Sequence, residues 1–464
     1  MFGRASGEAE MHRRTCVAVL IAAILLAAAC GSGTKSASAP TSTTPVSGAK
    51  PADVPGVGTG VTADAITLGV TLIDYSCLPK AVVSSIYVNQ PRAYNAFIDN
   101  INAKGGINGR KIKPVYKFIC PLQPEAAVSA CTALTDDSKA FAVVGSMYDP
   151  TGDAQLCVTK QHKTVLITDG LSQEMIDKSP QGLLLTPGIT ADRRLKVVMA
   201  LVKERHILDG KKVAVLTETT ATPRVKAVVL PTLDAMGVEQ GSEAVLSISG
   251  QDTTSAQAQL DSFIEKWKTE HVTALILVGS AASSKQFVDK VKAAIPDMQL
   301  VADTTSVESG GQDDVKAGVK PNPYDGIITA EGRIGLEHSR TPNYTYCKQI
   351  FEKQTGIKIP LPNVVVKLPN GQENNIYGNA EDACSYVTMF EDIAKRVGKD
   401  LNNSNWTNTV NTFGPVRVMN TDFASLHAGK YDADDTYGLV AFDPTIKPNG
   451  DWRHVTPTEN VSGG

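Results

Sequence analysis

Apolar positions along the chain follow two alternating periods, and this alternation predicts strands that are each followed by a helix. Residues 66–73 form an apolar, β-branched run, which is typical of a strand. The next apolar residues, Tyr94, Phe97, Ile98 and Ile101, are spaced i, i+3, i+4 and i+7. This spacing places the four side chains on one face of a helix. The pattern therefore predicts a strand and an amphipathic helix that covers it.

The same strand–helix unit recurs through the next two hundred residues. The predicted strands are 112–119, 141–145, 164–168, 213–216, 245–249, 272–278, 299–302 and 326–329, and the predicted helices are 124–135, 151–162, 191–206, 224–236, 255–269 and 285–294. The strands are short and almost continuously apolar, as expected for strands that are covered by helices on both faces. Two parallel sheets, and therefore two lobes, are predicted.

The last third of the chain is rich in helices and has too few strands for a third domain. Helices are predicted at 343–355 and 381–397, followed by a strand at 437–442. We expect these helices to pack on the first lobe and the tail to return to the second. The predicted lobes are residues 61–187 with 326–410, and residues 188–325 with 411–464.

The N-terminal pattern is that of an export signal. Arg14 precedes an apolar run at 16–29, and three alanines lie immediately before Cys30. The run is shorter than the roughly 20 residues that cross a bilayer, so a permanent membrane helix is the weaker interpretation. Residues 1–29 are therefore predicted to be a signal peptide, with Met11 as the expected true start because two glutamates precede it.

The residues around Cys30 resemble the bacterial lipoprotein signal, which implies lipid on this cysteine and attachment to the outer face of the cell membrane. A simple secretion signal with an unmodified cysteine is the alternative. Residues 30–60 contain mostly Gly, Ser, Thr, Pro and Ala, a composition that cannot bury enough apolar area to fold. They are predicted to be a flexible tether.

Composition and charge exclude several classes of function. The 464 residues are 42% hydrophobic and 20% charged, with a net charge of −3, so the clustered basic residues that bind nucleic acid are not expected. The seven histidines are scattered, and no His-Glu-x-x-His or Gly-x-Ser-x-Gly motif occurs, so we expect no enzyme, cofactor or metal. The acidic run 432–435 has some likeness to a calcium loop, but a solvated surface is the preferred interpretation.

Six cysteines remain after the leader and Cys30 are set aside: Cys77, Cys120, Cys131, Cys157, Cys347 and Cys384. An even number in an exported protein favours disulfides. Cys347 with Cys384 is the preferred pair, because both lie on predicted helices far from the other four. Buried free thiols are the alternative.

Three segments of the chain resemble a known protein family. The longest is Ile-Asn-Ala-Lys-Gly-Gly-Ile-Asn-Gly-Arg-Lys at 101–111, and it is supported by Ala-Val-Val-Gly-Ser at 142–146 and Gly-Asp-Trp at 450–452. From about residue 65 to 456 the chain resembles the branched-chain amino acid and amide class of ABC-transporter substrate-binding proteins. The resemblance implies a type I periplasmic-binding fold: an α/β protein of two doubly wound lobes with parallel central sheets, a ligand cleft and three hinge crossovers. It also implies a monomer outside the cytoplasm that passes a small polar solute to an ABC permease.

The resemblance assigns the first-lobe site to two loops that follow strands. Ser146, Tyr148 and Asp149 lie in one loop, and Asp169, Gly170 and Ser172 lie in the next. In the family these positions supply backbone N–H and hydroxyl donors to a carboxylate. Asp149, Asp169 and Ser172 can each equally cap a helix.

The remaining positions mark departures from the amino-acid-binding pattern. Tyr87, with Tyr75 as a second candidate, lies near an aromatic wall position of the family, although ordinary packing explains it equally well. In the second lobe, Thr222 and Ala281 stand where aromatic residues would cover the ligand, and the acidic position for a ligand ammonium falls at Asp303 or Thr304. Asp303 can also be a turn residue.

These departures leave the ligand open between an amino acid, an amide, a polyol and a cation. A carboxylate at Asp149 would repel an anionic ligand in a closed cleft. A sensor or scaffold lipoprotein that keeps the fold without transport is the alternative function.

Overall fold

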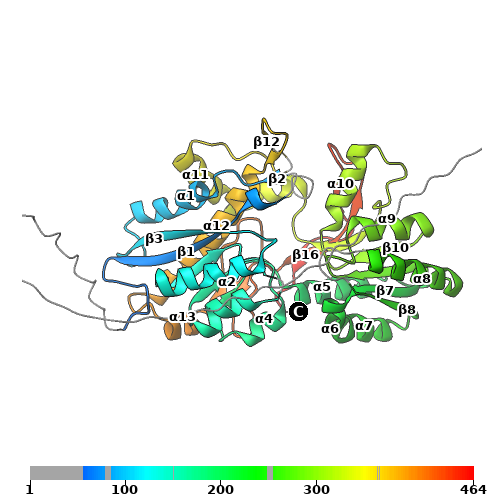
Figure 1. Ribbon diagram of the computed structural model, residues 1–464, viewed down its shortest axis with the longest axis horizontal. Helices are drawn as coiled ribbons and strands as arrows, with labels where there is room; N and C mark the ends of the chain where they lie inside the picture. The colour runs from blue at the N-terminus through cyan, green and yellow to red at the C-terminus, as the bar shows by residue number, and fades with distance from the viewer. Residues whose placement is uncertain are drawn as a thin grey trace, which may run out of the picture. The chain divides into compact units, whose positions relative to one another are not determined.

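The computed structural model describes residues 56–78, 85–149, 151–247, 254–362, 364 and 366–463. Within them, strands and helices alternate in the predicted order (Figure 1). The predicted signal peptide, the lipid site at Cys30 and most of the tether lie outside the described residues. None of the described helices has the length and apolar character that a membrane span requires.

The first sheet has five parallel strands in the order β3-β1-β4-β5-β6. The strands are β1 (Ala65–Ile73), β3 (Lys111–Ile119), β4 (Ala142–Gly145), β5 (Val165–Ile167) and β6 (Leu184–Leu185). The chain order reverses at β1, which has β3 on one side and β4 on the other. Loops after the carboxyl ends of such strands form the crevice in which open α/β sheets bind ligands.

Helices cover both faces of this sheet, as continuous apolar strands require. They are α1 (Gln90–Ala103), α2 (Pro124–Thr132), α3 (Asp153–Leu156), α4 (Gln173–Lys178), α11 (Pro342–Thr355), α12 (Ile376–Val397) and α13 (Asn403–Asn411). Figure 1 shows α1 and α11 on one side of the sheet and α2 on the other. Helices α11 and α12 pack on α1, and their side chains share one core with those of the first sheet.

The second sheet runs in the order β8-β7-β9-β10-β11-β16-β17, and β18 (Glu459–Asn460) pairs with β16. Its strands are β7 (Lys212–Glu218), β8 (Glu239–Leu246), β9 (Ala274–Val278), β10 (Gln299–Ala302), β11 (Ile328–Glu331), β16 (Thr436–Asp443) and β17 (Asp451–His454). The strands from β8 to β11 are parallel, whereas β16 and β17 add antiparallel pairs at one edge. The chain order reverses at β7.

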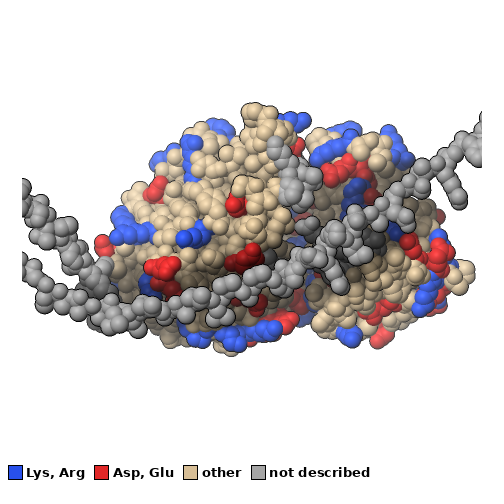
Figure 2. All heavy atoms as spheres, in the orientation of Figure 1, with Lys and Arg blue, Asp and Glu red and all other residues tan. Residues whose placement is uncertain are grey.

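Helices also cover the second sheet on both faces. They are α5 (Ala191–Glu204), α6 (Thr222–Arg224), α7 (Leu230–Met236), α8 (Thr254–Glu270), α9 (Lys285–Ala294) and α10 (Val307–Ala317). One core joins α8, α9 and α10 to one face, and a second joins α5 and α7 to the other. On the face shown in Figure 2, basic and acidic side chains are interspersed.

Three disulfides join the cysteines that follow the tether. Cys77 bonds Cys120, Cys131 bonds Cys157, and Cys347 bonds Cys384, which is the pair that the sequence favoured. All six lie on or beside elements of the first lobe. In contrast, residues 188–331 contain no cysteine.

The chain passes between the two sheets at 186–190, 332–341 and 420–435, and two of these crossovers are hydrogen bonded to each other. The Thr186 N–H donates to the Tyr431 carbonyl at 3.0 Å, and the Ala433 N–H donates to the Thr186 carbonyl at 2.9 Å. Hydrophobic residues from Phe413 to Ala433 belong to the first core, whereas Ile327, Ile328 and Ala330 belong to the cores of the second sheet. The second and third crossovers therefore begin later than the expected limits at 326 and 411.

The acidic run 432–435 lies in the third crossover and is not a solvated surface, so that interpretation was wrong. Asp432 and Asp435 are 3% and 1% exposed. Arg193 of α5 reaches both carboxylates at 2.9 Å, and Lys430 reaches Asp435 at 2.9 Å. Two cations thus neutralise two carboxylates, which allows all four to be buried at the junction of the crossovers.

Candidate functional site

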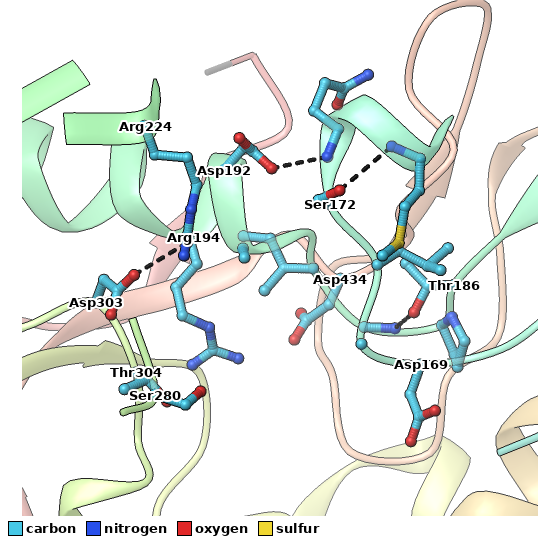
Figure 3. A pocket seen from close by; sticks show the side chains of 18 of the residues that line it. Asp169, Ser172, Thr186, Asp192, Arg194, Arg224, Ser280, Asp303, Thr304 and Asp434 are labelled. Carbon is cyan, nitrogen blue, oxygen red and sulfur yellow. Dashed lines mark hydrogen bonds and ion pairs between the residues drawn. The ribbon is translucent and has the colours of Figure 1, made fainter. Parts of the chain in front are cut away.

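A cavity of about 1470 Å³ lies beyond the carboxyl ends of strands from both sheets. Its walls come from the loops after β4 and β5 in the first lobe, the loops after β7, β9 and β10 in the second, and the crossovers. The position agrees with the rule that ligands bind where the strand order of an open α/β sheet reverses. In Figure 3, Arg194, Asp434 and Asp169 reach toward the same open space.

Four of the predicted first-lobe residues line this cavity: Tyr148, Asp169, Gly170 and Ser172. The Asp169 carboxylate is exposed to the cavity and accepts from the Ser146 hydroxyl at 3.1 Å. Ser172 caps α4 by accepting from the Met175 N–H at 3.3 Å, so it serves both as a cap and as part of the wall. Asp169 makes no such helix cap.

Asp149 does not line the cavity. Its carboxylate accepts from the Thr151 N–H at 2.9 Å and the Ala154 N–H at 2.8 Å, and the residue is 2% exposed. The bond from Ala154 satisfies an N–H in the first turn of α3, but the N-cap position itself is Gly152, so Asp149 is not the N-cap that the sequence offered as the alternative. The expected repulsion of an anionic ligand by Asp149 therefore has no basis in this geometry.

Tyr75 and Tyr87 lie outside the cavity lining but close to its carboxylates. Their rings meet edge to face at 5.9 Å between centroids. The neighbouring Asp382 carboxylate raises the pKa of Tyr87 well above its usual value, and burial followed by Asp382 and Asp169 raises that of Tyr75. The two tyrosines thus support the acidic part of the wall from behind.

The second-lobe predictions divide into two groups. Thr222 and Ala281 do not line the cavity; the Ala281 N–H donates to Glu218 at 3.0 Å. Asp303 and Thr304 do line it. Asp303 is 4% exposed and pairs with Arg224 at 3.0 Å (Figure 3), so its charge is already compensated by the protein.

The sequence did not indicate that α12 and the third crossover bring further acidic residues to the cavity: Glu381, Asp382 and Asp434. Burial raises the pKa of Glu381 and of Asp434 to about 7, and burial followed by the Glu381 charge raises that of Asp382 well above its usual value. The available signal was two adjacent acidic residues in a helix that is otherwise buried nearly all round.

The loss of folding stability that these buried acidic residues cause can be measured at Glu381. Its pKa rises from 4.5 to about 7 in the folded protein, so the fold favours the protonated carboxyl, and stability falls as the pH rises from about 4.5 through 7. We expect Glu381→Gln to raise the free energy of unfolding at pH 8 by on the order of 2 kcal/mol and to change it little at pH 5. Urea unfolding at both pH values measures the difference.

Glu391 on the same helix supplies the matched control. It is 3% exposed but pairs with Lys395 and Arg417, so its charge is compensated. Glu391→Gln should lower stability at pH 8 by about 1–2 kcal/mol, because partly buried cations lose their partner. Equal effects of the two substitutions at pH 8 would contradict the assignment of Glu381 as an uncompensated charge.

Comparison with known proteins agrees with this architecture. Residues 85–357 match the family model described as periplasmic binding protein. No curated protein sequence matches the chain. Among solved structures, the leucine-, isoleucine-, valine-, threonine- and alanine-binding protein from Brucella ovis is 14% identical with a TM-score of 0.60, covering 86% of this chain and 96% of that one.

Two further structures are similar in fold. A solute-binding protein from Rhodopseudomonas palustris BisB5 in complex with 3,4-dihydroxybenzoic acid is 13% identical, with a TM-score of 0.57 and coverage of 86% and 98%. The fatty acid substrate-binding protein from Thermomonospora curvata is 15% identical, with a TM-score of 0.58 and coverage of 88% and 95%. With its two doubly wound sheets and the cavity at their carboxyl ends, the chain belongs to the periplasmic binding protein family and has the type I fold.

Proposed function

We propose that this chain is the extracytoplasmic solute receptor of an ABC importer, which captures a small polar solute between its two lobes and does not catalyse a reaction. The observation that carries the proposal is the cavity of about 1470 Å³ whose walls come from strand-end loops of both sheets. Attachment to the outer face of the membrane through lipid on Cys30, and action as a monomer, belong to the same proposal.

The size of the cavity supports capture by closure. It exceeds the roughly 300–1,000 Å³ of sites that enclose a small ligand. A small solute would contact both walls only if the lobes approached each other. The crossovers are few, and two of them are hydrogen bonded side by side, which suits a hinge that bends without disrupting either core.

The molecules bound in structures of similar fold agree with a small solute. The protein from Desulfitobacterium hafniense is in complex with Leu, and that from Rhodopseudomonas palustris BisB5 holds 3,4-dihydroxybenzoic acid. Both are described as proteins of ABC transporters. These two structures support a role for this chain as a solute receptor. The identity of its ligand depends on the residues that line its own cavity.

Thermal unfolding of the protein without leader and tether tests the proposal against amino acids, amides, amines, sugars and hydroxybenzoates. A ligand at about 100 times its dissociation constant should add about 2.7 kcal/mol of stability. X-ray scattering with the same ligand should then show a smaller radius of gyration, because the lobes close. Stabilisation without any change in the radius would contradict closure.

The Ser280→Trp variant tests whether the ligand binds in the cavity or at another surface. Ser280 is exposed and lines the second wall, so a large ring there fills the cavity without disturbing a core. We expect it to abolish ligand stabilisation. Ser309→Trp, on exposed surface of α10 outside the cavity, should leave stabilisation unchanged. Ligand stabilisation that survives Ser280→Trp would place binding elsewhere.

A further inference from the structure

The cavity lining carries twice as many acidic as basic side chains. Ten carboxylates share this lining with five lysines and arginines. The basic side chains are largely committed to partners. Arg224 pairs with Asp303 at 3.0 Å, Arg194 with Glu331 at 3.6 Å, and Arg333 with Asp422.

The acidic excess is concentrated on the first-lobe wall. Asp169 follows β5, and Glu381 and Asp382 lie in the first turns of α12. Among the described residues, no Lys, Arg or His nitrogen lies within 4.0 Å of these three carboxylates. Their hydrogen bonds come from neutral groups: Ser146 donates to Asp169, Asn420 donates to Glu381, and the Tyr87 hydroxyl stabilises Asp382.

The three carboxylates lie on one part of the wall, because Glu381 and Asp382 are adjacent and the hydroxyl of Tyr386, one turn after Asp382 on α12, is hydrogen bonded to Asp169. Burial raises the pKa of Asp382, and the charges of Glu381 and Asp169 raise it further. Carboxylates without cations are costly in a partly enclosed site unless a positive charge joins them. A bound cation would therefore recover free energy that the empty site lacks.

A second observation points to a ligand at the same wall. Thr421 lines the cavity next to Asn420 and is 7% exposed, yet its hydroxyl has no hydrogen-bond partner among the described residues. Unpaired buried hydroxyls are uncommon. The Thr421 oxygen is covered in this conformation, so it would bond an occupant of the cavity after rotation of the side chain. Thr421 comes from the third crossover, so an occupant here would contact both the acidic wall and the hinge.

The spacing of the carboxylates favours an organic cation over a metal ion. Their oxygens do not come together within 4.8 Å in the described part of the chain, as they would around one ion. Aromatic side chains stand beside them instead: Tyr386 lines the cavity, and the edge-to-face pair Tyr75 and Tyr87 lies behind Asp382. Carboxylates beside tyrosine rings suit an ammonium or guanidinium group.

We propose that the solute is an organic cation whose amino or guanidino group binds to Asp169, Glu381 and Asp382. The proposal rests on the proposed function and names the solute class for the same cavity. It assigns cation binding to the wall opposite Asp303 and Thr304, the two positions at which the resemblance allowed an acidic partner for a ligand ammonium.

Calorimetry and thermal unfolding with agmatine, putrescine and choline test the proposal, with 1,4-butanediol as the uncharged counterpart of putrescine. We expect at least one cation to bind and the diol to be silent. Asp169→Asn and Asp382→Asn should each weaken cation binding roughly 10- to 100-fold, as expected for loss of a charged hydrogen-bond acceptor. Glu265→Gln, on an exposed residue of α8 outside the cavity that pairs with Lys268, should leave the affinity unchanged.

Loss of binding in these variants cannot be attributed to unfolding, because removal of an uncompensated carboxylate should leave the protein at least as stable as the parent. Failure of every cation to bind, or cation binding that both asparagine variants retain, overturns the proposal. If leucine or hydroxybenzoate then binds and Ser280→Trp abolishes that binding, the receptor function stands and only the solute class is wrong. If no solute of any class binds, the receptor function fails as well.

Discussion

Replacement of Arg193 by leucine is expected to lower the free energy of unfolding by about 3–5 kcal/mol, the range for removal of one partner from a buried ion pair. Arg193 is 7% exposed and pairs with both Asp432 and Asp435 at 2.9 Å. Without it, Lys430 alone faces two buried carboxylates. Urea unfolding followed by tryptophan fluorescence measures the loss.

Arg205→Leu at the end of the same helix is the matched control. Arg205 is exposed and forms an exposed ion pair with its neighbour Glu204 at 3.2 Å, so the substitution should change stability by less than about 0.5 kcal/mol. A loss below about 1 kcal/mol for Arg193→Leu would mean that the buried cluster contributes little to stability. The comparison also tests whether the third crossover is held to α5 mainly by charge.

Removal of the Cys347–Cys384 disulfide by a double serine substitution should cost about 3.8 kcal/mol from loop closure alone. The bond joins α11 to α12 across 37 residues, and loss of that constraint enlarges the unfolded ensemble. Thermal unfolding of the oxidised parent and the double variant measures the difference.

Chemical reduction of the parent distinguishes this effect from local damage by serine. Reduction opens all three disulfides, so its destabilisation should exceed that of the double variant, and the variant should still lose stability when it is reduced. An equally stable double variant would show that packing of α11 on α12 holds the first lobe without the bond.

Much of the fold could be predicted because each strand is a short apolar run in the sequence, and each helix has apolar residues at helical spacing. The helix at 285–294 and the strand at 299–302 have the predicted limits. Helix α10 was missed because Gly310 and Gly311 interrupt its pattern. A Cβ there would lie 2.5 Å from the Tyr324 hydroxyl and 2.6 Å from the Phe442 ring, so tertiary packing requires the glycines.

The residues that line the cavity could be predicted in part for a related reason. The loops after β4 and β5 are short and follow strands that the pattern identifies, so Tyr148, Asp169, Gly170 and Ser172 were found beside the cavity. The acidic residues of α12 could not be placed, because only the packing of a distant helix brings them to that wall. In the same way, the acidic run 432–435 was interpreted as a solvated surface because its partner Arg193 lies 239 residues before Asp432, so no local pattern indicates the ion pair.

The confinement of the disulfides to the first lobe has a practical consequence. Residues 188–331 contain no cysteine, so a single thiol introduced there has no neighbouring sulfur with which to form a wrong pair. Thr220 is exposed at the edge of the cavity and tolerates such a change on the second wall. A dye attached at this position would sense arrival of a solute and the approach of the acidic wall as a change in brightness. The protein is thereby a ready framework for an optical reporter of its own ligand.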